Sequence, residues 1–249
     1  FQMTERFPVV NRYAKPFVRQ GRRRIRTSTN SIGMLNMPKR EVKRLTLYGD
    51  SISGNCMKPK WTADLLGIEY DWVEMDLLAG AAQSEEFLAV NPVGQVPLAR
   101  WPDGRVLPQS NAIALYLAEQ SYSDLIPSDP FKKAQMMSWL FWEQYSHETA
   151  IAVRRFQKLY LKKSDDEIDP QLMSKGRRAL GVMELQLTYT DWMVGDQMTI
   201  ADIALLAYTR LAHEGGFDLS EFPSVERWVS RAETALGLEH AMPREGLAL

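Results

Sequence analysis

The 249-residue sequence has one cysteine, Cys56, and three histidines, His147, His213 and His240, scattered along the chain. A single cysteine cannot form an internal disulfide or supply a multi-cysteine metal site. A disulfide scaffold and a zinc module are therefore excluded, and we expect no metal. No apolar run approaches the ~20 residues that a membrane-spanning helix requires, so we also expect no membrane span.

Apolar residues make up 45% of the chain and charged residues 24%, a composition typical of folded globular proteins. A disordered chain and a collagen-like repeat are excluded by the same figures. At roughly 100–200 residues per domain, the length indicates one large or two modest domains.

The formal net charge of −1 hides a division of charge after Arg44. Residues 1–44 carry 12 Lys and Arg against Glu5 and Glu41, which is +10, so the remaining residues carry −11. Because this segment lacks a sustained apolar period, we predict a basic, flexible arm at 1–44, outside the fold. Clustered arginines favour nucleic acid through counterion release, but aromatic residues for base stacking are sparse there, so we expect no nucleic-acid partner.

From Leu45 onward, strand and helix signals alternate and are separated by turn residues. Their order is βαβαββα over residues 45–121, the order of a thioredoxin-like module. The two strands on either side of the first helix should be parallel, because a helical crossover joins them. The predicted elements are strands at 45–48, 70–75, 96–100 and 105–107, and helices at 55–66, 84–88 and 110–120.

After a proline-containing linker at 122–130, only helical periods follow. They predict an all-α domain at 131–240 and a tail at 241–249. Thr199 and Asp202 fit a capping box at the start of one of these helices. The helices are expected at 131–162, as one long helix or two abutting ones, and at 170–190, 200–213 and 223–236.

Two short segments of the first module carry binding chemistry. A strand that enters at Pro97 offers an exposed edge to a peptide-like ligand, and a cis Val96–Pro97 bond would present the Val96 backbone to it. The alternative is an ordinary trans proline at a strand edge. Ser110 directly precedes a helix, so we predict that it is the N-cap, and a helix N-terminus with a hydroxyl can also hold a carboxylate.

Residues 91–97, Asp103-Gly104 and the segment that begins with Gln109-Ser110 together resemble the glutathione-binding half of the glutathione transferase family. Residues 197–203 are similar to the capping box of that family's helical domain, so the resemblance covers about 45–240. Ser53-Gly54-Asn55-Cys56 and the segment 143–148 are similar to a bacterial, serine-type branch of the family.

The resemblance implies a thioredoxin-like domain followed by an all-α domain, in a cytoplasmic homodimer with glutathione as co-substrate. The Val96 backbone would pair with the cysteinyl amides of glutathione, with Pro97 in cis. Gln109 and Ser110 would hold the γ-glutamyl end, and Gln95 would reach toward the glycyl end.

In this family a Ser, Tyr or Cys after the first strand stabilises the glutathione thiolate, and here Ser51, Ser53 and Cys56 compete for that role. Counting back from Gly67, where the helix should end, favours Ser53, with a loop residue or helix cap as the alternative. Cys56 occupies the place of a resolving cysteine while Ser53 occupies that of the nucleophile, so two-thiol redox chemistry is excluded. Mixed-disulfide chemistry at Cys56 stays open beside a buried, inert Cys56.

A stripe of mostly aromatic and small side chains is predicted on one face of the helix at 131–162. We interpret Trp142 and Tyr145 as part of a pocket for a second substrate, with an ordinary core stripe as the alternative. His147 points elsewhere and receives no catalytic role. The stripe comprises Trp142, Tyr145, Thr149, Ala152 and Phe156.

The function predicted from the sequence is therefore that of a detoxifying glutathione transferase. It would add glutathione thiolate to an electrophilic small molecule or reduce a peroxide. The alternatives are a glutathione-dependent disulfide reductase and a non-catalytic binding module with the transferase fold.

The start of the helix predicted at 55–66 depends on Pro59. Pro59 would disturb a helix capped by Asn55 but would be harmless in one that begins near Lys58.

Overall fold

The computed structural model describes residues 44–241. The basic arm predicted at 1–44 and the tail predicted at 241–249 lie outside these residues, apart from Arg44 and Ala241. Within them, no helix is long and apolar enough to cross a membrane.

The first part of the described chain is a four-stranded mixed sheet in the order β2-β1-β3-β4. β1 and β2 are parallel, with α1 as the crossover between them, whereas β3 runs antiparallel to both β1 and β4. The predicted βαβαββα order is thereby confirmed, including the parallel first pair and the hairpin. The elements are β1 (Leu45–Gly49), α1 (Gly54–Leu65), β2 (Tyr70–Glu74), α2 (Glu85–Leu88), β3 (Leu98–Arg100), β4 (Val106–Pro108) and α3 (Ser110–Gln120).

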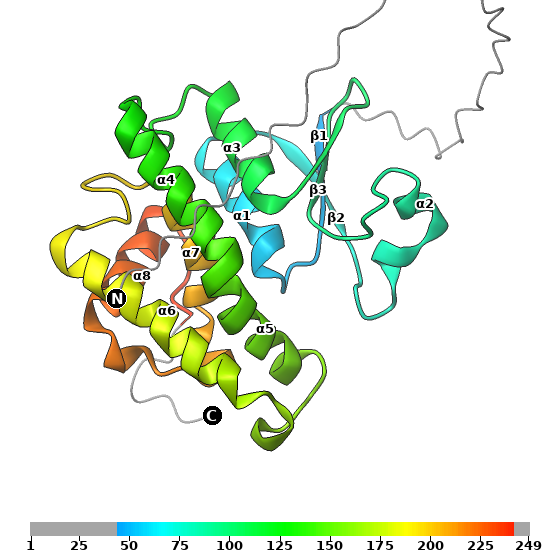
Figure 1. Ribbon diagram of the computed structural model, residues 1–249. Coiled ribbons are helices and arrows are strands. Elements are labelled where there is room, and N and C mark those ends of the chain that lie inside the picture. The colour runs from blue at the N-terminus through cyan, green and yellow to red at the C-terminus, as the bar shows by residue number, and fades with distance from the viewer. Residues whose placement is uncertain (1–43, 242–249) are drawn as a thin grey trace, which may run out of the picture. The chain divides into compact units, whose positions relative to one another are not determined.

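Helices cover both faces of this sheet. Figure 1 shows α1 and α3 on the face toward the helical domain and α2 beyond the other face. Leu47 packs with Ala63 of α1 and Ile113 of α3 on the first face, while Leu98 packs with Phe87 on the second. Side chains alternate along a strand, so neighbouring residues of the sheet serve two separate cores.

The second part of the chain is entirely helical, as predicted. Its centre is α7 (Ile200–Thr209), in which every residue is buried. The capping box of Thr199 and Asp202 is confirmed, and the Asp202 carboxylate also accepts hydrogen bonds from the Met193 N–H and the Trp228 indole. The other helices are α4 (Pro130–Trp142), α5 (Glu148–Leu159), α6 (Pro170–Tyr189) and α8 (Pro223–Ala235).

The helix predicted at 131–162 is two helices joined by a π-helical turn at Glu143–His147. In this turn the Glu148 N–H bonds to the Glu143 carbonyl, five residues back. The helix predicted at 200–213 is shorter than expected. It ends at Thr209, and a separate 3₁₀ turn follows at Ala212–Gly215.

The two domains meet where α7 packs against α1 and α3. Gly54 makes this close approach possible, because a Cβ there would lie 2.7 Å from the Tyr208 ring and 2.9 Å from the Ala207 carbonyl. The first turn of α1 is therefore held directly against the helical domain.

Candidate functional site

A cavity of about 610 Å³ opens at the starts of α1 and α3, beside α5. Its volume lies within the range usual for small-molecule sites. The five residues predicted to bind glutathione all line it: Gln95, Val96, Pro97, Gln109 and Ser110. Sequence positions that are up to 15 residues apart are thus brought to one site.

The loop that leads into β3 forms one wall of this cavity. The Val96–Pro97 peptide bond is cis, as predicted. The Asn91 side chain donates to the Gln95 carbonyl at 2.7 Å, which fixes the loop from within. The predicted exposed strand edge is wrong, because β3 is paired on both sides; the backbone next to the cavity belongs to the residues that precede the strand.

The start of α3 forms the opposite wall. Gln109 is the N-cap residue, with φ 75° and ψ 115°, and Ser110 is the first residue of the helix. The prediction that Ser110 is the N-cap is therefore wrong by one residue, since the break in backbone conformation falls at Gln109. The first N–H groups of a helix have no partner within it, so this end of α3 can bind an anion.

The three competitors for the catalytic position after β1 have different surroundings. Ser51 is exposed and donates its N–H and hydroxyl to the Glu74 carboxylate, at 2.8 and 3.0 Å. Ser53 is half-buried as the N-cap residue of α1, and its side chain lies near the Tyr208 hydroxyl and the Cys56 thiol. Of the three, Ser53 is the one at the N-cap position of α1.

Cys56 is fully buried in the first turn of α1. Burial raises the pKa of its thiol to about 11, because a thiolate there would lose its hydration. Cys56 is therefore protonated at neutral pH, which disfavours a nucleophilic role.

The helical domain holds the loop that precedes Ser53. The Tyr160 hydroxyl donates to the Asp50 carboxylate at 3.2 Å, and that carboxylate accepts the Ile52 N–H at 2.7 Å. Asp50 thus couples the loop backbone to a side chain near the end of α5.

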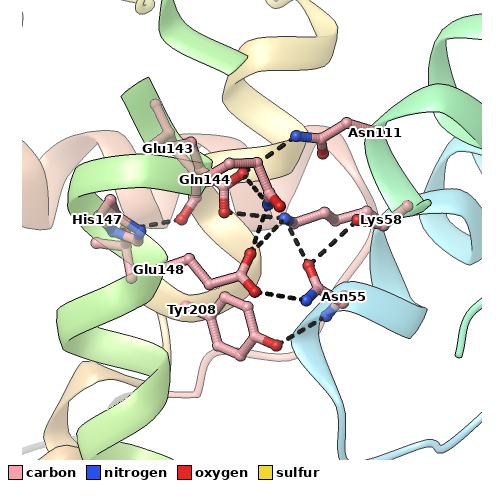
Figure 2. Close-up of polar contacts among 11 residues, drawn as sticks. Asn55, Lys58, Asn111, Glu143, Gln144, His147, Glu148 and Tyr208 are labelled. Atoms are coloured by element: carbon pink, nitrogen blue, oxygen red, sulfur yellow. Dashed lines mark hydrogen bonds and ion pairs between the residues drawn. The ribbon is translucent and has the colours of Figure 1, made fainter. Parts of the chain in front are cut away.

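Asn55 is a cavity residue that the sequence reasoning did not identify. Its Nδ2 donates to Glu148 Oε1 at 2.8 Å, and its Oδ1 accepts from Lys58 Nζ at 2.8 Å and from the Ser110 hydroxyl at 3.2 Å. Figure 2 shows Asn55 between Lys58, Glu148 and Tyr208, whose hydroxyl accepts the Asn55 N–H. The side chain and backbone N–H of Asn55 thus join α1, α3, α5 and α7.

Behind Asn55 lies a buried group of charges formed by Lys58, Glu143 and Glu148 (Figure 2). Lys58 and Glu143 are fully buried, with Lys58 Nζ 2.9 Å from Glu143 Oε1 and 3.6 Å from Glu148 Oε2. Burial opposes ionisation of Glu143, but attraction to Lys58 and His147 and the hydrogen bonds from Gln144 and Lys58 together hold the pKa of Glu143 below its usual range. Burial raises the pKa of Glu148, which is partly exposed at the cavity.

His147, also in the π-helical turn, is completely buried, and its Nε2 lies 2.9 Å from Thr209 Oγ1. Burial lowers the pKa of its imidazole to about 4. The neutral ring is therefore packed against α7 through Thr209.

The predicted second-substrate stripe divides after Thr149, which lines the same cavity as Trp142 and Tyr145. Trp142 and Tyr145 line a separate cavity of about 360 Å³ against α6, and Tyr145 is 84% exposed. Ala152 and Phe156 line a hollow of about 350 Å³ that shares Glu148 and Phe156 with the main cavity. The two parts of the stripe therefore face different cavities.

Comparison with known proteins gives two family matches in chain order. Residues 52–120 match the model described as "Glutathione S-transferase, N-terminal domain", and residues 141–234 match "Glutathione S-transferase, C-terminal domain". Glutathione S-transferase D7 of Drosophila melanogaster is 30% identical over 194 residues, which cover 77% of this chain and 85% of that protein.

Solved structures of two bacterial proteins show the same fold. A glutathione S-transferase from Pseudomonas fluorescens is 46% identical with a TM-score of 0.73, over 76% of this chain and 94% of that one. A glutathione S-transferase from Xanthobacter autotrophicus is 39% identical with a TM-score of 0.74, over 80% of this chain and 97% of that one. Both likenesses span the thioredoxin-like and the helical domain.

Proposed function

The chain belongs to the glutathione S-transferase family, and on that premise we propose that it binds glutathione in the 610 Å³ cavity and adds the glutathione thiolate to an electrophilic small molecule. One observation carries the proposal. The five residues assigned to glutathione from the resemblance alone all line this one cavity.

Glutathione has a carboxylate at each end and peptide groups between them, and each part finds a complementary wall. The γ-glutamyl carboxylate would lie at the N-terminus of α3, near Gln109 and Ser110, where the helix dipole favours an anion. The Val96 backbone would pair with the cysteinyl amides, and Gln95 would reach toward the glycyl end.

Ser53 would stabilise the thiolate. Its hydroxyl would donate a hydrogen bond to the sulfur, and the N-terminus of α1 would add a favourable dipole, so both lower the pKa of the bound thiol. The thiolate would then attack an electrophilic carbon, forming a C–S bond as the leaving group departs with its electron pair. The high pKa of Cys56 disfavours the alternative mixed-disulfide route.

We place the electrophile in the hollow that adjoins the main cavity. Ala152, Phe156 and Leu161 give this hollow an apolar lining, and it lies beside Glu148. This suits an apolar acceptor near the thiolate. The pocket predicted at Trp142 and Tyr145 stays a prediction for a second, separate cavity.

The decisive experiment is thermal unfolding with increasing glutathione, followed by activity assays. At a hundredfold excess over Kd, glutathione should raise the free energy of unfolding by about 2.7 kcal/mol. Electrophilic haloarenes, an organic peroxide and a mixed disulfide, assayed in parallel, separate conjugation from peroxidase and reductase activity. An unfolding temperature indifferent to millimolar glutathione would overturn the proposal.

A cytoplasmic homodimer is part of the same proposal and rests on the family alone. Size-exclusion chromatography with light scattering tests the dimer. A monomer at micromolar concentration would contradict it.

A further inference from the structure

We propose that Lys58 is a positioning residue for glutathione binding: its buried ammonium, held by Glu143 and Glu148 of the helical domain, fixes the Asn55 amide and the Ser110 hydroxyl at the cavity. This inference rests on the proposed function. It assigns a role in that function to an ion cluster that crosses from one domain to the other.

Three oxygen atoms lie within 4 Å of the Lys58 ammonium. Its Nζ is 2.8 Å from Asn55 Oδ1, 2.9 Å from Glu143 Oε1 and 3.6 Å from Glu148 Oε2. An ammonium group has three N–H donors, and three oxygens surround this one. Lys58 therefore has a defined position, and Asn55 Oδ1 is one of the atoms it defines.

A buried ion cluster of this kind contributes little to the stability of the fold by itself. Burying charges removes their hydration, and apolar side chains of similar size often serve a protein core as well or better. Here the polar groups lead to a ligand cavity instead, because Asn55, Gln144 and Glu148 all line it. Gln144 also donates to Glu143 Oε2 at 2.8 Å, so the cavity wall and the buried pair form one network.

Lys58 decides which way the Asn55 amide points. With Oδ1 facing the ammonium, Nδ2 faces Glu148, and Oδ1 also accepts the Ser110 hydroxyl at 3.2 Å. When a glutathione carboxylate arrives, Ser110 must turn its hydroxyl from Asn55 to the ligand. Asn55 Oδ1 keeps Lys58 as its donor during this exchange, so no buried acceptor is left without a partner.

The π-helical turn brings Glu143 and Glu148, the first residue of α5, to the one cation. Glu143 and Glu148 are five residues apart, and the turn closes with the bond between their own backbone groups. Residues five apart lie near each other in a π turn but diverge in an α-helix. The irregular turn thus places both carboxylates within 4 Å of Lys58, an arrangement a regular helix would not give.

The test is a charge-balanced double variant, Lys58→Met with Glu143→Gln, which removes one cation and one anion together. We expect a folded protein whose Kd and KM for glutathione rise roughly tenfold, the effect of losing about one hydrogen bond, while kcat and the KM for the electrophile change little. Isothermal titration calorimetry and steady-state kinetics measure these quantities.

A matched control is Arg210→Met with Glu233→Gln, which removes another buried pair, 2.7 Å apart, between the end of α7 and α8. It should lower the unfolding temperature without raising the glutathione Kd. A control that weakens glutathione binding as much as the Lys58 variant does would overturn the proposal, because any loss of stability would then explain both.

The outcomes separate this inference from the proposed function. A wild-type protein that does not bind glutathione overturns the proposed function itself. A wild-type protein that binds, with a double variant that binds equally well, overturns only the role of Lys58. If the double variant does not fold, Lys58→Gln alone removes the ammonium and keeps a polar side chain beside Glu143; unchanged glutathione affinity in that variant also overturns the proposal.

Discussion

Arg155 Nη1 of α5 donates a 3.0 Å hydrogen bond to the backbone carbonyl of Ile52, the residue before Ser53. The two partners are 103 residues apart in the chain. Arg155 is buried and is held in turn by an ion pair with Glu214. The backbone conformation just ahead of the proposed thiolate-stabilising serine therefore depends on a side chain of the helical domain.

Replacing Arg155 by Lys should lower kcat/KM clearly while it changes the unfolding temperature little. A lysine can keep the charge opposite Glu214, but it lacks the fork that also reaches Ile52. Losing one hydrogen bond from a charged donor corresponds to about 1.5 kcal/mol, or roughly tenfold in kcat/KM if Ser53 is displaced. Steady-state kinetics and thermal unfolding measure the two effects.

The control for this prediction is the neighbouring substitution Arg154→Lys. Arg154 is also buried, but its guanidinium donates to the Gly215 carbonyl and pairs with Asp165, away from the loop before Ser53. It should leave turnover near the wild-type level. Equal losses in both variants would mean that the loop contact has no special effect.

Replacing Ser53 by Ala should lower turnover roughly 10- to 100-fold, since a hydrogen bond to a charged group contributes about 1.5–3 kcal/mol. The pKa of bound glutathione should rise in parallel, because the hydroxyl favours the thiolate. Glutathione affinity should change little. The ultraviolet absorbance of the thiolate across a pH series reports the pKa, and Ser51→Ala, whose hydroxyl faces Glu74, is the control.

Replacing Cys56 by Ala should leave turnover unchanged and cost a little stability through a small cavity. In the native wild-type protein a disulfide reagent should label the thiol slowly at neutral pH, because burial holds its pKa near 11. In denaturant the same thiol should react at the rate of a model thiol. If the alanine variant folds normally and loses activity, the mixed-disulfide mechanism replaces the one involving Ser53.

Most of the fold could be predicted because local signals carry it. Turn residues such as Gly67 and Pro102 separate the elements, and helical periods identify the second domain. Strand order is not a local property, so the sequence wrongly suggested an open edge where β3 is paired on both sides. The neighbours of a strand depend on contacts between distant segments, which one sequence does not reveal.

The same distinction between local signals and distant contacts separates the site residues that the sequence predicted from those that it missed. Gln95 through Pro97 were found because a motif marks them, whereas Asn55 looks like a helix cap and Lys58 like an ordinary surface charge. Their role comes from the approach of α5, which buries Lys58 beside Glu143. The start of α1 also differs from both alternatives considered for Pro59, a cap at Asn55 and a start near Lys58. With Ser53 as the cap, Pro59 lies inside α1, where it cannot donate to the Asn55 carbonyl.

The last prediction concerns acid stability and starts from His147. Burial lowers the pKa of this imidazole from 6.5 to about 4, with the Glu143 carboxylate opposing that shift and Lys58 adding to it. The unfolded chain therefore binds a proton between pH 6.5 and 4 that the folded chain does not bind. Stability must rise with pH across this window and fall as the pH drops through it.

Between pH 7.5 and 5, this one group should lower the free energy of unfolding by about 2 kcal/mol. Glu148 has the opposite sign, since its raised pKa makes the folded protein bind the extra proton, so the total slope of the wild type is smaller. A His147→Gln variant should lose the His147 component. Its unfolding free energy, measured in urea, should therefore fall less than that of the wild type over the same range.

The control Thr209→Val removes the hydrogen-bond partner of the imidazole but not its burial, and should retain the wild-type slope. Equal slopes for wild type and His147→Gln would show that His147 is not the group that titrates.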